Sequence, residues 1–235
     1  MDSDFKFKQF VVRQDRCAMK VGTDSVLLGG WALPPSEGAI LDIGSGTGLL
    51  SLMLAQRTLC DITAIEINTA AAEQAAENFQ KSKWKNRLKS KCEDIQIFSK
   101  GAMGKFNYVI SNPPYFAQGE RSEVAARARA RHSDSLNLAV LLKVVHEVLN
   151  EDGRFALVLP YSMRLEFIRN MVRQGFWIER ELRVSPNPGE PPVRVLLEMR
   201  KTIPEFYSTD ELAIEKGGRH VYTSSFLKYT RDFYL

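Results

Sequence analysis

The chain has 235 residues, of which 44% are hydrophobic and 26% charged, so it can bury a full core and has the composition of a globular protein. Its acidic start lacks an apolar leader segment, and no run of eighteen apolar residues occurs, so we expect neither a secretory signal nor a membrane span. The net charge of +4 is compatible with a polyanionic partner without requiring one.

Segments rich in β-branched residues alternate with segments of helical composition. Expected strands cover residues 39–43, 61–67, 88–92, 107–111, 154–159, 176–184 and 193–200, and expected helices cover 49–57, 69–82, 136–149 and 164–174. Thr69 is the expected N-cap of the second helix. This order predicts an α/β fold with a seven-stranded, mostly parallel sheet and helices on both faces. We expect one domain over residues 1–235, with an N-terminal extension of about residues 1–30 packed on it.

The three cysteines, Cys17, Cys60 and Cys92, lie far apart and match no cysteine or histidine spacing of a metal site. Their odd number argues against a disulfide framework. Reduced thiols, a cytoplasmic location and no bound metal are the simplest expectations.

A glycine-rich turn follows the first expected strand. Gly44, Gly46 and Gly48 permit positive φ and let backbone N–H groups approach a ligand closely. A dinucleotide-binding fingerprint would need its third glycine at the position of Leu49. Asp42, just before the turn, would repel a pyrophosphate but could position a cationic ligand. S-adenosylmethionine fits, because it carries an ammonium and a sulfonium group and no phosphate.

Two further acids follow the next two strands. Glu66 ends the second strand, where a carboxylate can accept hydrogen bonds from both ribose hydroxyls. Asp94 follows the third strand and could accept from an adenine amino group, although a solvated turn residue is a comparable interpretation. With Asp42 and Glu66 in register, the turn predicts S-adenosylmethionine as the cofactor; alone it could be only a tight strand-to-helix connection.

The segment Asn112-Pro113-Pro114-Tyr115 follows the fourth strand. The side-chain oxygen of Asn112 and the carbonyl of Pro113 can each accept one hydrogen of an exocyclic amine. Tyr115 offers a ring on which a base can stack, worth about 1–3 kcal/mol. These features predict methyl transfer to a planar amino nitrogen, driven by positioning and electrostatics without a strong base. The alternative is a proline-rich loop with Tyr115 in the core.

The glycine turn and the 112–115 segment resemble the class I amino-methyltransferases, which act on adenine N6, guanine N2 or a glutamine amide. Residues 7–10, 14–24 and 227–235 resemble, more specifically, the bacterial tRNA(Val) adenine-37 N6-methyltransferases. The resemblance spans nearly the whole chain. It implies a Rossmann-like fold and a monomeric or weakly associating cytoplasmic enzyme that methylates an adenine beside the anticodon. It also implies that Lys20 and Thr23 lie against the methionine end of the cofactor, which Asn112 borders too.

The sequence identifies an RNA-binding surface less clearly than it identifies the cofactor site. Arg127, Arg129 and Arg131 follow the 112–115 segment and share one face only if the chain is extended. They could contact phosphates, or they could belong to a solvated loop. Lys6 and Lys8 alternate with phenylalanines that could line an RNA path or equally cap the sheet.

Three functions remain open on these grounds. The leading one is methylation of a tRNA adenine at N6. The second is another amino-methyltransferase activity, on guanine N2 of ribosomal RNA or on a protein glutamine, since the same tetrapeptide suits both acceptors. The third is a non-catalytic RNA-binding module that uses S-adenosylmethionine, which an intact Asn112–Tyr115 segment disfavours.

Overall fold

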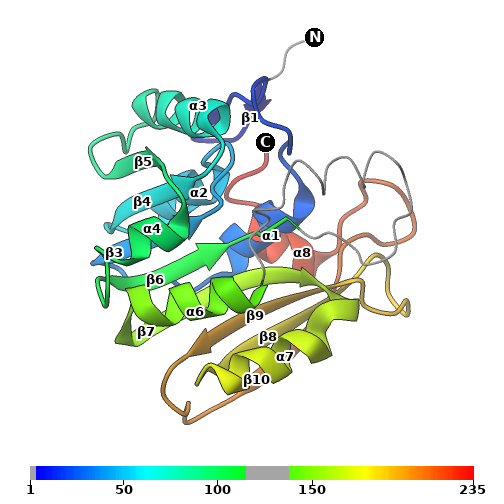
Figure 1. The fold of residues 1–235 in the computed structure, drawn as a ribbon. Helices are drawn as coiled ribbons and strands as arrows, with labels where there is room; N and C mark the ends of the chain where they lie inside the picture. Colours follow the sequence, from blue (N-terminus) through cyan, green and yellow to red (C-terminus); the bar gives the residue numbers. More distant parts are fainter. Residues whose placement is uncertain (1–3, 115–137) are drawn as a thin grey trace, which may run out of the picture.

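A central eight-stranded sheet forms the framework of the computed structural model, which describes residues 4–114 and 138–235 (Figure 1). Its strands are β3 Ala39–Ile43, β4 Asp61–Glu66, β5 Leu88–Cys92, β6 Phe106–Ser111, β7 Leu149–Pro160, β8 Trp177–Ser185, β9 Arg194–Arg200 and β10 Ser208–Ala213. Their order across the sheet is β10-β8-β9-β7-β6-β3-β4-β5, and β9 runs antiparallel to both of its neighbours while the other pairs are parallel. A separate two-stranded sheet pairs β1 Phe5–Lys6 with β2 Val11–Val12.

The predicted α/β fold is confirmed, but the prediction of seven strands is wrong by one. The additional strand is β10, which pairs in parallel with β8 at the edge of the sheet. Four of its six residues are exposed, so its sequence lacks the apolar alternation by which strands are recognised. Edge strands of this polar kind also resist pairing with other chains.

Helices cover both faces of the sheet. They are α1 Thr23–Trp31, α2 Leu49–Arg57, α3 Thr69–Gln80, α4 Ile95–Ser99, α6 Leu138–Val148, α7 Arg164–Arg173 and α8 Ser224–Thr230, with a short 3₁₀ turn η1 at Tyr161–Met163. α1, α2, α3 and α8 pack on one face, and α4, α6 and α7 pack on the other (Figure 1). The N-cap of α3 is Asn68, one residue before the predicted Thr69, because the Asn68 side chain accepts from the Ala71 N–H.

Two apolar cores follow from the alternation of side chains along the strands. Ile40 of β3 and Ile110 of β6 point into the core beneath α1 and α2, whereas their neighbours Leu41 and Val109 point into the core beneath α6 and α7. A strand that is buried on both faces reads as a continuous apolar run, which is why these central strands were predictable.

The chain direction across the sheet reverses between β3 and β6. From β3 the chain proceeds outward through β4 to β5, and it then returns to β6 and β7 on the other side of β3. In open α/β sheets a ligand binds at the carboxyl ends of the strands at such a switch point. The segments at this place are the glycine turn after β3 and Asn112 after β6.

The N-terminal segment packs against the last residues of the chain. Phe7 and Phe10 are buried and their rings stack, and Tyr234 stacks on Phe7 at a centroid distance of 6.0 Å. The N–H of Lys8 donates to the Phe233 carbonyl (2.8 Å). These aromatic rings therefore serve the core, which decides between the two interpretations left open by the sequence.

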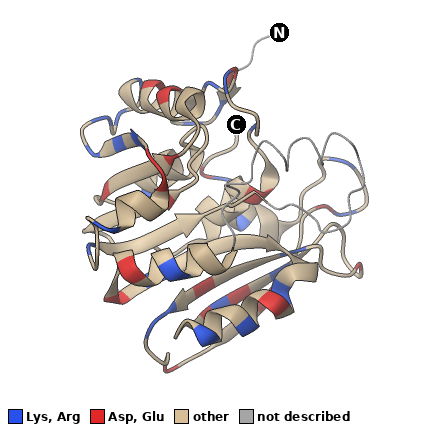
Figure 2. Ribbon diagram, in the orientation of Figure 1, with Lys and Arg blue, Asp and Glu red and all other residues tan. Residues whose placement is uncertain are grey.

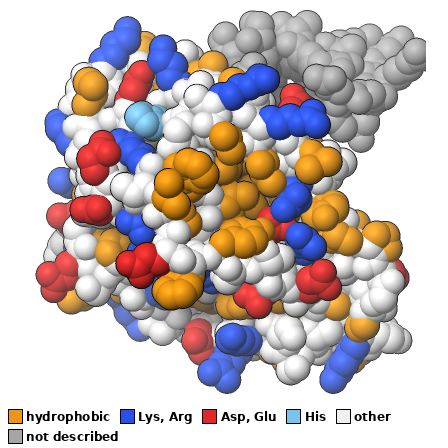
Figure 3. Space-filling model, turned by 90° about the horizontal axis from the view of Figure 1, so that it is seen from below, with side chains coloured by type: hydrophobic (Ala, Val, Ile, Leu, Met, Phe, Trp, Pro, Cys, Tyr) orange, Lys and Arg blue, Asp and Glu red, His pale blue; other side chains and the backbone are white. Residues whose placement is uncertain are grey.

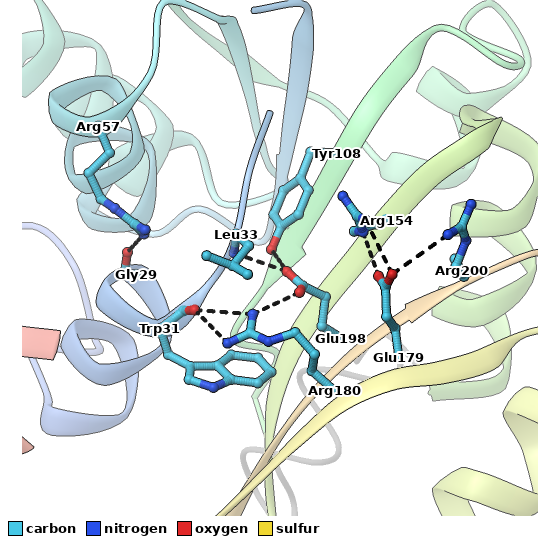
Figure 4. A network of polar contacts seen from close by, with 10 residues as sticks. All are labelled: Gly29, Trp31, Leu33, Arg57, Tyr108, Arg154, Glu179, Arg180, Glu198 and Arg200. Atoms are coloured by element: carbon cyan, nitrogen blue, oxygen red, sulfur yellow. Dashed lines mark hydrogen bonds and ion pairs between the residues drawn. The ribbon is translucent and has the colours of Figure 1, made fainter. Parts of the chain in front are cut away.

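A buried polar network ties α1 to the antiparallel strands (Figure 4). The fully buried carboxylate of Glu198 accepts from the Leu33 N–H (3.0 Å), the Tyr108 hydroxyl and Arg180 Nη1 (2.8 Å). The Arg180 guanidinium also lies over the Trp31 ring, 4.2 Å from its centroid. Burial and the neighbouring Glu198 raise the pKa of Tyr108 well above its ordinary value, so its hydroxyl stays protonated and donates.

The surface carries charges of both signs. Basic and acidic side chains are interspersed along α6 and α7 (Figure 2). Apolar side chains gather among charged ones on the face seen from below (Figure 3). Leu165 and Val172 of α7 are among the exposed apolar side chains. Within residues 4–114 and 138–235, no helix has the length and apolarity needed to cross a membrane.

Candidate active site

The glycine turn adopts a conformation that requires glycine. Gly44, Gly46 and Gly48 have φ of 69°, 54° and 80°, in the left-handed region that other residues avoid. A Cβ on Gly48 would also lie 2.4 Å from the ring of Phe79 in α3. The Gly44 N–H donates to the Ile65 carbonyl (2.9 Å), which fixes the turn against the carboxyl end of β4.

Glu66 lies directly beside this turn. Its Oε2 accepts from the Gly46 N–H and its Oε1 from the Asn68 N–H, each at 2.9 Å. The side chain is half-buried, and a carboxylate has lone pairs beyond these two bonds. The arrangement leaves Glu66 able to accept hydroxyl donors, as the sequence predicts, while it also braces the turn.

Asn112 meets the glycine turn at a narrow pocket of about 50 Å³. The pocket is lined by Met19, Lys20, Val21, Ser25, Gly44, Ser45, Gly46, Thr47, Leu49, Leu50 and Asn112. The structure thus brings together Lys20, Gly44, Gly46 and Asn112, which come from three distant parts of the sequence. The Asn112 Nδ2 donates to Ser25 Oγ at 2.8 Å. Ser25 was not predicted, because it stands one residue beyond the block whose resemblance drew attention to Lys20 and Thr23.

The remaining predicted site residues are placed as follows. Thr23 is exposed at the first residue of α1, outside the pocket lining. Asp94 is the N-cap of α4, with its Oδ1 accepting from the Gln96 N–H at 2.7 Å. Pro113 is buried and Pro114 exposed. Lys6 and Lys8 are exposed, and the Lys8 ammonium donates to the Arg231 carbonyl. Tyr115, Arg127, Arg129 and Arg131 lie outside the described residues.

Residues 19–21 form one wall of the pocket, and the segment 13–21 that carries them is held by side-chain amides. Asn78 of α3 accepts from the Arg13 N–H (3.0 Å) and donates to the carbonyl of Thr47 (2.9 Å) in the turn. Gln14 Oε1 accepts from the Val21 N–H (2.7 Å), and the Lys20 ammonium donates to the Gln14 carbonyl. The wall and the glycine turn are therefore linked through one helix.

Asp42 lies beneath the turn with no exposed surface. Its Oδ2 accepts from the N–H (3.1 Å) and hydroxyl (2.7 Å) of Ser51, while its Oδ1 has no hydrogen-bond partner among the described residues. Burial raises the pKa of Asp42 to about 7. Ser45 Oγ is likewise buried without a partner in the part of the chain that the structure describes. Asp42 Oδ1 and Ser45 Oγ, unpartnered among the described residues, leave acceptors at this turn that fit a polar, cationic ligand. The N–H groups of Gly44, Gly46 and Gly48 instead donate within the protein, to Ile65, Glu66 and Ser45.

We expect Asp42→Asn to change the pH dependence of stability. Because the pKa of Asp42 is raised from 3.8 to about 7 in the folded state, its protonated carboxyl contributes to the free energy of unfolding. This contribution is complete below about pH 4 and is lost as the pH rises to about 7. The free energy of unfolding of Asp42→Asn, relative to the parent, should rise by about 2–4 kcal/mol between pH 4 and pH 8. Urea denaturation at both pH values measures this, and all other titrating groups cancel in the difference. A difference independent of pH would contradict the buried, raised-pKa state of Asp42.

We expect Glu66→Ala to weaken the affinity for S-adenosylmethionine about 10- to 100-fold, because a charge-assisted pair of hydrogen bonds is worth about 1.5–3 kcal/mol. Calorimetric titration measures the affinity, and thermal unfolding reports whether the turn survives. Glu37→Ala is the matched control, since Glu37 is exposed just before β3, at the end of that strand opposite the glycine turn. Unchanged affinity in a folded Glu66→Ala protein would remove Glu66 from the site.

Known proteins resemble this chain over nearly its full length. The methyltransferase small domain family matches residues 21–176. Relatives named tRNA1(Val) (adenine(37)-N6)-methyltransferase include one from Bacteroides fragilis, 42% identical, with 98% of this chain and 97% of the relative covered. Another, from Pectobacterium carotovorum, is 43% identical, with coverage of 98% and 93%. A third, from Trichodesmium erythraeum, is 38% identical, with coverage of 99% and 98%.

Solved structures agree on the fold. A protein from Agrobacterium tumefaciens described as a predicted O-methyltransferase superposes with a TM-score of 0.69 at 19% identity, with 89% of this chain and 96% of that chain covered. A glycopeptide N-methyltransferase in complex with S-adenosylmethionine gives a TM-score of 0.55 at 15% identity, with coverage of 78% and 94%. A Rossmann-like sheet, a glycine turn beside Glu66 and an Asn112 facing that turn agree with these similarities. The chain is a class I, S-adenosylmethionine-dependent methyltransferase and belongs to the family of the tRNA1(Val) (adenine(37)-N6)-methyltransferases.

Proposed function

We propose that this enzyme methylates N6 of adenine 37 in the anticodon loop of a valine tRNA. The observation that carries the proposal is Asn112, placed by the end of β6 across a narrow pocket from the glycine turn, in a chain 38–43% identical to relatives named for this reaction. The family name supplies the substrate, and the geometry of Asn112 supports an amino acceptor.

The bound cofactor supplies an electrophilic methyl group on sulfur. The chain's own part is to hold the amine in line with that methyl group. The Asn112 Oδ1 and the Pro113 carbonyl accept the two amine hydrogens, which draws the nitrogen lone pair out of conjugation with the ring. A nitrogen that has gained a methyl group loses its proton readily to water, so positioning contributes most of the acceleration.

The base must leave its stack to reach this pocket. An anticodon loop presents unpaired bases, so the energy needed to turn one outward is small compared with a duplex. We propose that Tyr115 then stacks on the base and that Arg127, Arg129 and Arg131, together with Lys6 and Lys8, contact flanking phosphates. Because its substrate is tRNA, we place the enzyme in the cytoplasm, and we propose that it acts as a monomer.

The test is product identity. The purified enzyme is incubated with labelled S-adenosylmethionine and, in separate reactions, with unmodified valine tRNA, the same tRNA carrying guanine at position 37, ribosomal RNA and total protein. We expect N6-methyladenosine in the unmodified tRNA alone, by nucleoside analysis. Label in guanosine of ribosomal RNA or in protein glutamine would instead support one of the alternatives, and the guanine-37 tRNA shows whether the labelled position is the proposed one.

A further inference from the structure

The amide of Asn112 can perform its role in only one of two orientations. Its oxygen and its NH₂ group are nearly identical in shape, so packing alone distinguishes them poorly. With the oxygen toward the substrate amine, the amide accepts a hydrogen. With the NH₂ group toward the amine, two sets of donors face one another, and the amine is repelled. The productive orientation turns the NH₂ group away from the substrate, so it is stabilised by a neighbouring group that accepts from that NH₂.

Ser25 is in the position to do this. Its Oγ lies 2.8 Å from the Asn112 Nδ2, and both side chains line the same pocket although they stand 87 positions apart in sequence. When the substrate amine occupies Oδ1, the NH₂ group of Asn112 still needs an acceptor, and a half-buried donor without one is unfavourable. The Ser25 hydroxyl oxygen satisfies that need.

Ser25 is itself fixed on both sides. Its neighbour Asp24 forms an ion pair with Arg194 at the start of β9 (2.8 Å between Oδ2 and Nε), and its other neighbour Val26 is fully buried. Both contacts anchor the first turn of α1 against the sheet. A hydroxyl on an anchored helix stays in place and can keep the Asn112 amide in one orientation. A hydroxyl on a loose segment would move with the amide and could not.

We propose that Ser25 is a positioning residue for methyl transfer: its hydroxyl oxygen accepts from the Asn112 Nδ2 and keeps the amide oxygen turned toward the substrate amine. This inference rests on the proposed amino-methyltransferase function and deepens it. Ser25 acts through Asn112 and supplies no group to the reacting atoms.

The test compares Ser25→Val with Ser25→Thr, two side chains of matching shape that differ by the hydroxyl. With the tRNA substrate and labelled cofactor, we expect Ser25→Val to lower kcat about five- to tenfold relative to Ser25→Thr, the loss of one neutral hydrogen bond. KM for tRNA and the calorimetric affinity for S-adenosylmethionine should agree within twofold between the two. Thermal unfolding confirms that both proteins are folded.

A double-mutant cycle separates positioning from a general structural effect. In an Asn112→Ala background, single-turnover rates of Ser25→Val and Ser25→Thr should be equal, because the amide that Ser25 orients is gone. Three results would each overturn the inference. Ser25→Val and Ser25→Thr could have equal kcat when Asn112 is present, the rate loss of Ser25→Val could persist in the Asn112→Ala background, or Ser25→Val could lose affinity for S-adenosylmethionine by the same factor as kcat. If the parent enzyme methylates no tRNA, the proposed function fails instead, and the two failures are distinguishable.

Discussion

Replacing Asn112 by alanine should lower turnover by about a hundredfold or more while leaving the affinity for S-adenosylmethionine near that of the parent enzyme. The expectation follows from the loss of an acceptor that acts on the reacting amine, since removal of a comparable oriented group in other enzymes costs about 10²–10³ in kcat. The glycine turn and Glu66, which we expect to hold the cofactor, are untouched by this change. Single-turnover methylation and calorimetric titration measure the two quantities separately.

Asn107→Ala is the matched control for this experiment. Asn107 stands on the same strand, β6, but near its other end, where its Oδ1 accepts from the Ala39 N–H at 2.9 Å. We expect a stability loss of about 1 kcal/mol from this variant and an unchanged kcat. An Asn112→Ala enzyme that turned over as fast as Asn107→Ala would show that the acceptor site has been misplaced.

Glu198→Ala should destabilise the fold by about 3–5 kcal/mol, the range found when one partner of a buried ion pair is removed. The change leaves the Arg180 guanidinium, the Tyr108 hydroxyl and the Leu33 N–H without their common acceptor (Figure 4). The cost arises from buried donors and a buried charge that lose their partner rather than from the lost Coulomb attraction alone. Urea denaturation with a constant m-value measures the change.

Glu151→Ala is the control that shows whether the stability loss of Glu198→Ala comes from burial or from the loss of an ion pair as such. Glu151 also forms an ion pair, with Lys201 at 3.1 Å, but its side chain is 82% exposed. Exposed pairs contribute about 0–1 kcal/mol, so this variant should be nearly neutral. If both variants lost the same stability, the network around Glu198 would have no special role in the fold.

The sequence predicted those elements whose residues carry their own signal. The helix at 49–57 and the strand at 39–43 have the predicted bounds, because a continuous apolar run or an apolar helix bounded by glycine is unambiguous. β10 was missed because an exposed edge strand has no such run. The strand predicted at 154–159 in fact begins at Leu149, since the pairing of Leu149 with Phe106 of β6, rather than local composition, determines where β7 starts.

The candidate site divides in the same way. The glycine turn, Glu66 and Asn112 were found because their spacing relative to the strands reflects the shared edge of a parallel sheet. The Asp42 side chain points inward, toward Ser51, because α2 packs over β3. No pattern in the local sequence predicts this orientation. Nor could any pattern have linked Ser25 to Asn112, because that contact forms only after the sheet has brought the two segments together.

The pairing of the two ends of the chain constrains the order in which this protein can mature. The segment that walls the glycine turn is preceded by Phe7 and Lys8, whose contacts are the Tyr234 ring and the Phe233 carbonyl. During synthesis from the N-terminus, those partners are translated only after every strand of the sheet. Contacts of such large sequence separation form late, because the loop between them must close first. A nascent chain that has completed its sheet would thus already hold residues 13–21 through α3 but would still lack the contacts that fix Phe7 and Lys8. We therefore expect the N-terminal residues ahead of that segment to become protected from proteolysis only after Phe233 and Tyr234 have been made.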